Sequence, residues 1–452
     1  MTEPTNTDLN SEPMYYNYAG KFPPLSLGSK HAFPPSDSFQ TNPKVITDTT
    51  LRDGAQDSRF AIFPHPTKLK YYDLLHELDN GTGTIEAIEV FIYQKRDIWV
   101  LEKLLEREYE FPEVTTWTRA LPKDIRDLVK IAGGAIKETG LLASASDHHI
   151  FDRLKFRSKA AAMESYLAPI MTAAEHGIRP RVHLEDCTRA DIEGWVLPFM
   201  KTVIKETDGW ARFRICDTIG WGIPDPRAEA PFGIPQLISR LYQETGAELE
   251  FHGHNDFGLA TANTIAAWLY GCRRANVAFG GLGERTGNTS LEQMLAALVR
   301  LWGDPGLELE ALADLTRLID TEVIQTPSKS PIVGDSIFST QAGLHQTGVA
   351  RQNKAAGGLI YLAYQPSLVG RTNEEYNQIG SLSGMDGLVA ILNGEARLRG
   401  EPERFSTTSR RVKQLYDYVQ DLYDGQWNEK KGEFVNYRTT FFSPAELYDL
   451  TI

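Results

Sequence analysis

The chain has 452 residues, of which 41% are hydrophobic and 24% are charged, and its formal net charge is −13 at pH 7. This composition is typical of a soluble globular protein and excludes a disordered or collagen-like chain. The negative charge argues against nucleic acid or a membrane surface as a partner, and no hydrophobic run approaches the roughly 20 residues that span a bilayer. The N-terminus is polar and acidic, and the odd number of cysteines cannot form a complete disulfide framework, so we expect a cytoplasmic protein.

Residues 1–44 are expected to form an N-terminal extension. They contain many Pro, Asn, Ser and Tyr residues and show no sustained periodicity. The aromatic stretches MYYNYAGKF and HAFPPSDSF also allow a second interpretation, an arm that packs on its own domain or on a neighbouring subunit.

Residues 45–301 alternate short β-branched or apolar runs with longer amphipathic stretches, which predicts repeated βα units. Eight such units fit an α/β fold of the (β/α)8 TIM-barrel type, here the expected catalytic domain. The main alternative, a doubly wound open sheet, needs a Gly-rich phosphate loop after the first strand, and TTLRDGAQ is not one. The expected strands are 45–49, 86–91, 114–119, 139–143, 181–185, 213–217, 249–254 and 276–279.

The alternation of short apolar runs with amphipathic stretches ends after the expected barrel. Residues 302–400 begin with an amphipathic helix, continue through a Pro/Gly/Ser-rich connection and predict a linker with a small helical subdomain. Residues 401–452 include RRVKQLYDYVQDLYDG and predict a helical tail. The barrel is therefore expected to be followed by a small, mainly helical C-terminal region.

Polar residues gather at the predicted C-terminal ends of the strands, where TIM barrels carry their reactive groups. His252 and His254 share one strand face because they are two residues apart. With Asp53 and a carbonyl oxygen such as that of Asn288, they would form a mixed N/O site. That ligand set suits a divalent cation such as Mn²⁺, Mg²⁺, Co²⁺ or Zn²⁺ with positions open for substrate. Two strand histidines can also simply form surface hydrogen bonds, but their place at the seventh strand end favours metal.

Three spaced motifs, DTTLRDGAQ, HGHNDFGLATANTIAAW and GGLGERTGN, resemble the DRE-TIM metallolyase superfamily. Within it, the chain resembles the Claisen-condensing acyltransferases: the isopropylmalate, homocitrate, citramalate and Re-type citrate synthases. The resemblance covers residues 45–398 and includes PIVGDSIFSTQAGLHQTG, YLAYQPSLVG and SLSGMDGLVAIL after the barrel. It implies an acyltransferase that uses acetyl-CoA, a 2-oxo acid and a divalent metal cation.

The same resemblance assigns residues to the metal and to the 2-oxo acid. It implies that Arg52 polarises the 2-oxo acid carbonyl, which is sensible because metal and guanidinium together stabilise a developing alkoxide. It implies that Thr218 contacts the substrate carboxylate, although a strand-end turn hydroxyl is the alternative. The metal positions that it implies are Asp53, His252, His254 and Asn288.

Proton abstraction from the acetyl methyl group requires a positioned base. Glu185, His345 and Tyr361 match family positions linked to this step, and the sequence does not choose among them. His345 lies beyond the barrel and in related enzymes reaches a partner's active site, so a homodimer or higher homo-oligomer is expected.

Two further residues are expected near the substrate. His149 in SASDHHIF matches the family's Ser-Asp-x-His pattern, and His148 is expected to be an exposed neighbour. Arg119 in TWTRAL matches a basic position after the third strand, with a salt bridge at the barrel rim as the alternative.

The sequence departs from isopropylmalate synthases near the expected substrate pocket. The segment 89–96, EVFIYQKR, replaces a Gly-Phe-Pro-type turn, and His183 stands where a small residue is common. We expect His183, Lys95 and Arg96 to add polar or basic groups that pair with a second acidic group of the substrate. This favours oxaloacetate, as in Re-type citrate synthase; phosphonomethylmalate or phosphinomethylmalate synthase, homocitrate synthase and 2-isopropylmalate synthase are the alternatives.

Other classes of function are disfavoured by missing residues. A hydroxymethylglutaryl-CoA-type lyase, which cleaves a C–C bond, needs a cysteine in a Gly-rich loop after the barrel, and no cysteine occurs there. A biotin-dependent carboxyltransferase needs a modified lysine near the fifth strand end, where RVHLEDCTR has none. A non-catalytic scaffold would require Arg52, Glu185 and His345 to be dispensable together.

Overall fold

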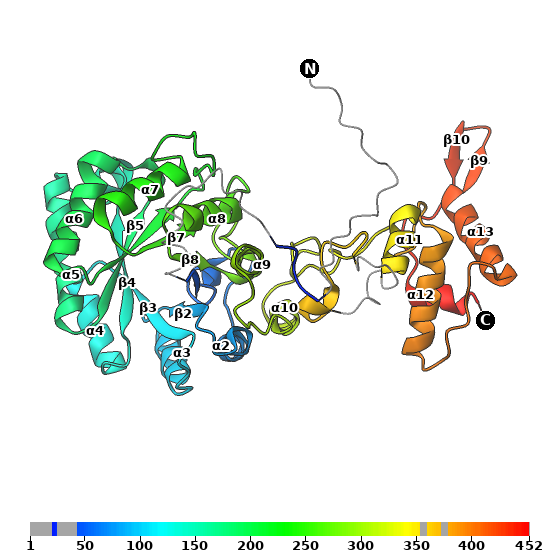
Figure 1. The fold of residues 1–452 in the computed structure, drawn as a ribbon, viewed down its shortest axis with the longest axis horizontal. Helices are drawn as coiled ribbons and strands as arrows, with labels where there is room; N and C mark the ends of the chain where they lie inside the picture. The colour runs from blue at the N-terminus through cyan, green and yellow to red at the C-terminus, as the bar shows by residue number, and fades with distance from the viewer. Residues whose placement is uncertain (1–19, 25–42, 353–358, 372–377, 452) are drawn as a thin grey trace, which may run out of the picture. The chain divides into compact units, whose positions relative to one another are not determined.

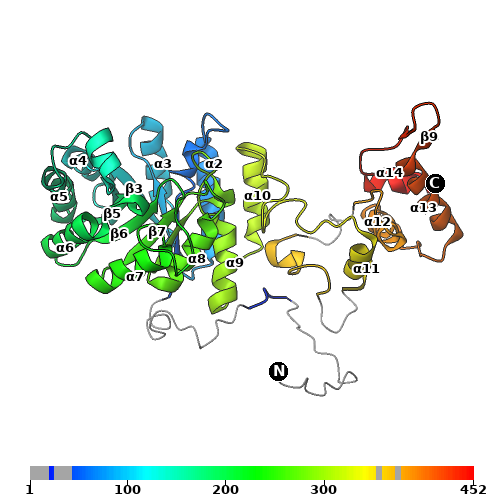
Figure 2. The same ribbon diagram turned by 90° about the horizontal axis from the view of Figure 1, so that it is seen from above.

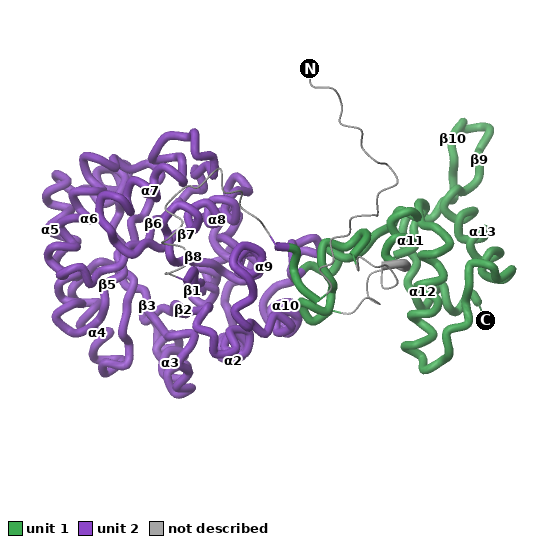
Figure 3. The backbone as a smooth tube through the Cα atoms, viewed as in Figure 1, with its two compact units in different colours: residues 1–23, 334–452 green, residues 24–333 purple. Residues whose placement is uncertain are grey.

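A computed structural model of the protein describes residues 20–24, 43–352, 359–371 and 378–451. The chain divides into two compact units, Pro24–Val333 and Met1–Pro23 with Gly334–Ile452 (Figure 3). Most of the expected N-terminal extension lies outside the described residues. Within the described part, no helix is both long enough and apolar enough to cross a membrane.

The first of these units is a closed barrel of eight parallel strands in sequence order, which confirms the predicted TIM barrel (Figure 1). Each strand starts and ends within two residues of its predicted position. The strands are β1 (Val45–Asp48), β2 (Ile85–Val90), β3 (Glu113–Arg119), β4 (Glu138–Ser144), β5 (Arg179–Glu185), β6 (Arg212–Asp217), β7 (Leu249–Gly253) and β8 (Arg274–Val277).

Helices surround the barrel, as two perpendicular views show (Figures 1 and 2). Many of their apolar side chains are buried. Local sequence sets their ends: the Ser158 side chain accepts a hydrogen bond from the Ala161 amide at the start of α5, and Gly133 ends α4 in a left-handed conformation. The helices are α2 (His65–Asp79), α3 (Lys95–Leu105), α4 (Pro122–Ala132), α5 (Lys159–Glu175), α6 (Leu197–Glu206), α7 (Ile234–Thr245), α8 (Ala260–Tyr270), α9 (Leu291–Trp302) and α10 (Ala311–Glu322).

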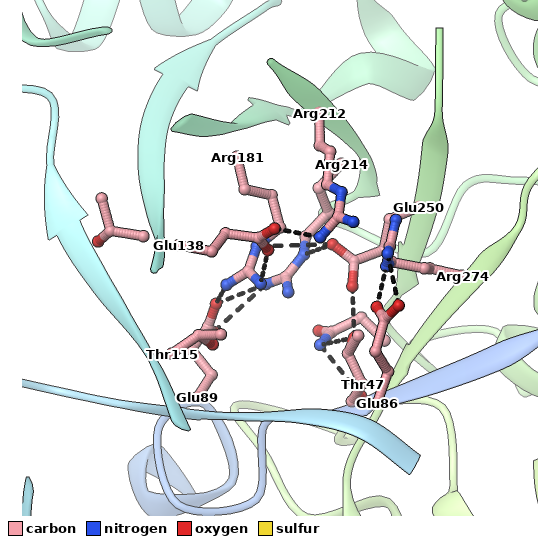
Figure 4. A network of polar contacts seen from close by, with 12 residues as sticks. Thr47, Glu86, Glu89, Thr115, Glu138, Arg181, Arg212, Arg214, Glu250 and Arg274 are labelled. Atoms are coloured by element: carbon pink, nitrogen blue, oxygen red, sulfur yellow. Dashed lines mark hydrogen bonds and ion pairs between the residues drawn. The ribbon is translucent and has the colours of Figure 1, made fainter. Parts of the chain in front are cut away.

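The interior of the barrel is filled by ion pairs instead of the branched aliphatic side chains usual in this fold (Figure 4). Arg214 donates from Nε to Glu250 at 2.6 Å and from Nη1 to Glu89 at 3.1 Å. Arg181 pairs with Glu89 and, at 2.7 Å, with Glu138. Four of these residues are almost fully buried and form a fixed, charged floor beneath the strand ends: Glu89 on β2, Arg181 on β5, Arg214 on β6 and Glu250 on β7.

The second unit is mainly helical, as predicted, with a short antiparallel hairpin that the sequence did not indicate. Its core is apolar and includes Leu388, Leu392, Val412, Val419 and Leu447. Its elements are α11 (Gly343–Gln352), α12 (Met385–Leu398), α13 (Arg410–Asp424), β9 (Gln426–Asn428), β10 (Glu433–Val435) and α14 (Pro444–Asp449).

Candidate active site

A cavity of about 310 Å³ opens at the C-terminal ends of the barrel strands. One wall is aromatic and apolar, and the remainder carries nitrogen, oxygen and sulfur groups that converge from most of the strands. The lining residues are Arg52, Asp53, Gln56, Phe91, Tyr93, Trp117, Leu142, His183, Glu185, Cys216, Thr218, His252, His254, Glu284 and Arg285.

Asp53, His252 and His254 form one buried cluster in this cavity, with ligand atoms that all lie within 4.8 Å of one another. The Nε2 atoms of the two histidines are 3.2 Å apart, and Oδ2 of Asp53 lies 3.9 Å from Nε2 of His252. Nδ1 of His252 is 2.7 Å from the amide oxygen of Asn276, which fixes Nδ1 as the donor and leaves the Nε2 lone pair free.

The protonation states of the cluster also suit a metal. Burial and the neighbouring His254 lower the pKa of His252, and burial lowers the pKa of His254. Burial opposes ionisation of Asp53, but Arg52 and the two histidines outweigh it and hold the pKa of this carboxyl well below its usual range. Two neutral imidazoles and a carboxylate are ligands for a divalent transition metal or Mg²⁺.

Asn288 completes the cluster through its side chain. Its Nδ2 donates to Oδ2 of Asp53 at 2.7 Å and to the carbonyl of Leu282 at 2.8 Å. Its Oδ1 is buried and has no hydrogen-bond partner within the described residues. An unpartnered buried oxygen beside three ligand atoms fits a fourth metal ligand, because a buried acceptor without a partner is otherwise costly. The geometry brings the four predicted residues together, and their role as metal ligands stays a prediction.

Arg52 lies beside the cluster and is held from two sides. Nη1 donates to Asp53 at 2.5 Å, and Nε donates to Glu89 at 2.6 Å. Sequence analysis missed Glu89, although a charged residue inside the apolar strand β2 signals a buried partner. Its burial opposes ionisation, but Arg214, Arg52 and Arg181 hold the pKa of Glu89 well below its usual range. Arg52 is thus an oriented cation next to the candidate metal ligands.

Glu185 ends β5 at the cavity and forms a network with Ser144, the last residue of β4, and with Arg153, which follows that strand. It accepts hydrogen bonds from Ser144 at 2.5 Å and from Nη1 of Arg153 at 2.9 Å. Burial alone would raise its pKa, but hydrogen bonds from His149, Arg153 and Ser144 outweigh burial and lower the pKa to about 2. A carboxylate this acidic is a poor proton acceptor at neutral pH, which argues against Glu185 as the base.

His149 lies behind Glu185 and does not line the cavity. Its Nδ1 is 3.3 Å from Oε2 of Glu185, and its Nε2 is 3.7 Å from Oδ2 of Asp186. It belongs to the turn His148–Arg153, in which His148 is exposed as predicted. The geometry places His149 against Glu185, and its predicted contact with substrate stays a prediction.

Thr218 and His183 both line the cavity, and their predicted contacts with substrate stay predictions. The Thr218 hydroxyl accepts a hydrogen bond from the amide of Asp186 at 2.7 Å, which positions it at the rim. His183 is 2% exposed, and burial together with the nearby Arg214 holds its pKa well below its usual range. His183 is therefore polar but uncharged, so it does not supply the positive charge that was one possibility from sequence.

The expectation that Lys95 and Arg96 face the substrate is wrong. β2 ends at Val90, and the chain then turns into α3, which starts at Lys95 behind a capping box formed by Gln94 and Asp97. Both basic side chains are consequently exposed and do not line the cavity.

Arg119 does not line this cavity, and its predicted contact with substrate stays a prediction. Its Nε donates to Asp124 at 2.9 Å, and its side chain is 59% exposed. Asp124 in the first turn of α4 neutralises the guanidinium of Arg119. This is the salt bridge at the barrel rim that the sequence left open as the alternative.

His345 and Tyr361 belong to the unit after the barrel and contact each other. Their rings stack with centroids 4.4 Å apart, and both side chains are exposed. Their part in proton transfer stays a prediction.

Known proteins are similar to this chain in sequence. The HMGL-like family model matches residues 44–319, and the chain belongs to that family. A Citrate (Re)-synthase of Clostridium kluyveri is 38% identical over 389 residues, which cover 84% of this chain and 82% of that protein. A Citrate (Re)-synthase of Syntrophus aciditrophicus is 34% identical over 84% of this chain, a match that spans only 60% of that longer protein.

A solved structure shares the fold. The hydroxymethylglutaryl-CoA lyase of Pseudomonas aeruginosa matches with a TM-score of 0.51 at 20% sequence identity, over 64% of this chain and 96% of that one. At this level of identity the match supports the barrel architecture alone.

Proposed function

We propose that the protein is an acyltransferase that condenses the acetyl group of acetyl-CoA with a 2-oxo acid, oxaloacetate, to form citrate. The observation that carries this proposal is the juxtaposition of Arg52 with the Asp53, His252 and His254 cluster at one end of a cavity. The Citrate (Re)-synthases among its relatives support the choice of reaction. We further propose that it acts in the cytoplasm as a homodimer or higher homo-oligomer.

The reaction balances without a redox partner. A base removes a proton from the acetyl methyl group, the resulting enolate carbon attacks the ketone carbon, and the electrons of the C=O π bond move to the oxygen to give an alkoxide. The alkoxide then takes up a proton, equivalent to the one that the base removed, and becomes the tertiary hydroxyl of the product. Water then cleaves the thioester, which releases the CoA thiol and the product carboxylate. A divalent cation bound at the cluster would hold the 2-oxo acid and stabilise negative charge on its oxygen.

The described residues supply orientation and charge for these steps. Arg52 donates to the oxygen that becomes the alkoxide, and Glu89 keeps its guanidinium in place. Thr218 contacts the substrate carboxylate at the rim. Because Glu185 is too acidic to accept a proton readily, we assign it an orienting role and assign proton abstraction to the exposed His345–Tyr361 pair of a second copy of the chain.

The cavity favours a short dicarboxylic 2-oxo acid over a branched apolar one. His183 adds a buried polar group to a site whose other walls include Phe91, Trp117 and Leu142. An apolar substrate side chain would leave this group unpaired, which costs about 1–3 kcal/mol. A C–C bond-cleaving lyase fits less well, because Cys216 is the only lining cysteine among the described residues, and burial raises the pKa of its thiol well above the usual value.

A thiol-release assay tests the proposal. With acetyl-CoA and added divalent metal, we expect the highest kcat/KM with oxaloacetate among oxaloacetate, 2-oxoglutarate, pyruvate, 2-oxoisovalerate and phosphonopyruvate. Release of thiol with none of the five would contradict the proposed reaction. A preference for 2-oxoisovalerate would contradict only the proposed substrate.

A further inference from the structure

His183 occupies a space that the neighbouring strand leaves open for it. It lies in β5, two residues before Glu185, and pairs in register with Leu142 of β4. Two residues earlier, β4 has Gly140, where an added Cβ would lie 2.5 Å from Nε2 and 2.8 Å from Cε1 of His183. The absence of a side chain at Gly140 therefore permits the observed position of the imidazole.

The hydrogen bond of His183 to Arg181 determines which ring nitrogen carries the proton. Nε of Arg181 lies 3.2 Å from Nε2 of His183. A guanidinium only donates hydrogen bonds, so Nε2 must be the acceptor. Because the ring is uncharged, its single proton is then on Nδ1. Within the described residues Nδ1 has no hydrogen-bond partner, and His183 lines the cavity, so this donor is available to a ligand.

Arg181 belongs to the charged floor and is immobilised by the carboxylates around it (Figure 4). It is 1% exposed, pairs with Glu89 and Glu138, and has Nε 3.6 Å from Glu250. A side chain held by three carboxylates on three different strands cannot easily change its hydrogen bond to the imidazole. The orientation of His183 is thus set by the barrel interior.

We propose that Arg181 is a positioning residue for substrate selection: it holds His183 as the neutral Nδ1–H tautomer, which donates a hydrogen bond to the distal carboxylate of the 2-oxo acid. This inference rests on the proposed function for the identity of the substrate. The sequence allowed a positively charged group to pair with the distal carboxylate. Here an uncharged imidazole recognises it by donating a hydrogen bond. A substrate without a distal acceptor leaves the donor unpaired, which favours oxaloacetate over pyruvate by about 10-fold or more.

A test without substrate is ¹⁵N NMR of the full chain labelled with [¹⁵N]histidine, in which loss of a signal in His183→Phe assigns the residue. We expect a protonated Nδ1 and an unprotonated Nε2 at pH 7. Arg181→Lys retains the charge but removes the Nε donor, so we expect a mixed tautomer. If that variant does not fold, Gly140→Ala serves instead, because its Cβ displaces the ring from Arg181. A protonated Nε2 in the unaltered chain would overturn the inference.

Selectivity gives the second readout. His183→Phe and Arg181→Lys should each lower the ratio of kcat/KM for oxaloacetate to that for pyruvate about 10-fold, through a higher KM for oxaloacetate. Leu142→Val, at the paired position, should change both substrates alike. An unchanged ratio in His183→Phe would overturn the inference.

The pH dependence separates a neutral donor from a cation. The charged groups that face His183 are Arg181, Arg214, Arg52 and Glu89. The pKa values of His183 and Glu89 lie well below their usual ranges and that of Arg214 lies above its own, so none of these three groups changes charge between pH 6 and 9. The ratio for oxaloacetate over pyruvate should therefore stay constant across this range. A ratio that falls as pH rises through 7 would show that a positively charged His183 is needed. Failure of thiol release with every 2-oxo acid would contradict the proposed function and leave the tautomer result standing.

Discussion

Replacing Glu89 by Gln should destabilise the barrel more than any surface ion-pair change. Glu89 is 1% exposed and accepts from Arg52 at 2.6 Å, from Arg214 at 3.1 Å and from Arg181. The amide would remove the negative charge and turn an –NH2 group toward guanidinium donors. Removing one partner of a buried ion pair costs about 3–5 kcal/mol. At roughly 2 °C per kcal/mol for a large domain, Tm of the barrel should fall by about 6–10 °C.

The assay is thermal unfolding followed by circular dichroism in the presence of a chelator, so that metal binding does not contribute to the difference. Glu106→Gln is the matched control, because Glu106 makes an exposed pair with Lys103 and is expected to change stability by less than about 0.5 kcal/mol. If Glu89→Gln melts within about 2 °C of the unaltered protein, the interior ion pairs do not hold the floor of the site as argued.

Four further changes test other parts of the account. His254→Ala should lose bound divalent metal, measured by elemental analysis, while far-ultraviolet circular dichroism shows an intact fold; retained metal would contradict the ligand assignment. Arg52→Ala should keep the metal but lower kcat about 100- to 1000-fold, and a loss of only a few-fold would refute its role. Lys95→Ala should leave KM for oxaloacetate unchanged, because Lys95 is exposed on α3. Burial raises the pKa of Asp48 to about 7, so the folded protein keeps a proton between about pH 4 and 7 that the unfolded chain releases, and stability falls as pH rises through that window. Asp48→Asn should remove this pH dependence and be more stable than the unaltered protein at pH 8 in urea titrations; equal stability there would contradict the buried-carboxyl argument.

The barrel could be predicted because its signals are local and repeated. Each strand is a short apolar run bounded by an amphipathic helix, and eight repeats leave few alternative architectures. The metal cluster followed from the same logic. Parallel strands bring their C-terminal ends to one rim, so Asp53 after β1 and His252 in β7 meet although they are far apart in sequence.

The direction of side chains at strand ends could not be predicted. Lys95 and Arg96 follow β2 so closely that a small shift in its end decides whether they face substrate or solvent. The chain in fact enters α3 at Lys95. Arg119 is the last residue of β3, and its orientation depends on Asp124, a partner that only the packing of α4 brings into contact.

The charged interior was also not foreseen from sequence. Four charged residues lie within otherwise apolar strands: Glu89, Arg181, Arg214 and Glu250. Their spacing would equally suit strands with one face exposed to solvent, so it does not predict that they are buried. Only closure of the barrel brings these four together and buries them. The neutral state of His183 follows from that closure, because burial and the nearby guanidinium groups disfavour a second proton.

The central claim is that this site joins an acetyl group to oxaloacetate with the help of a divalent metal. It is tested most directly by incubating the protein with [2-¹³C]acetyl-CoA, oxaloacetate and divalent metal, and by measuring free CoA and ¹³C-labelled citrate together by mass spectrometry. We predict one labelled citrate for each CoA released, loss of both after chelation, and recovery when metal is returned. CoA release without labelled citrate, or full turnover in chelator-treated protein, would contradict the account.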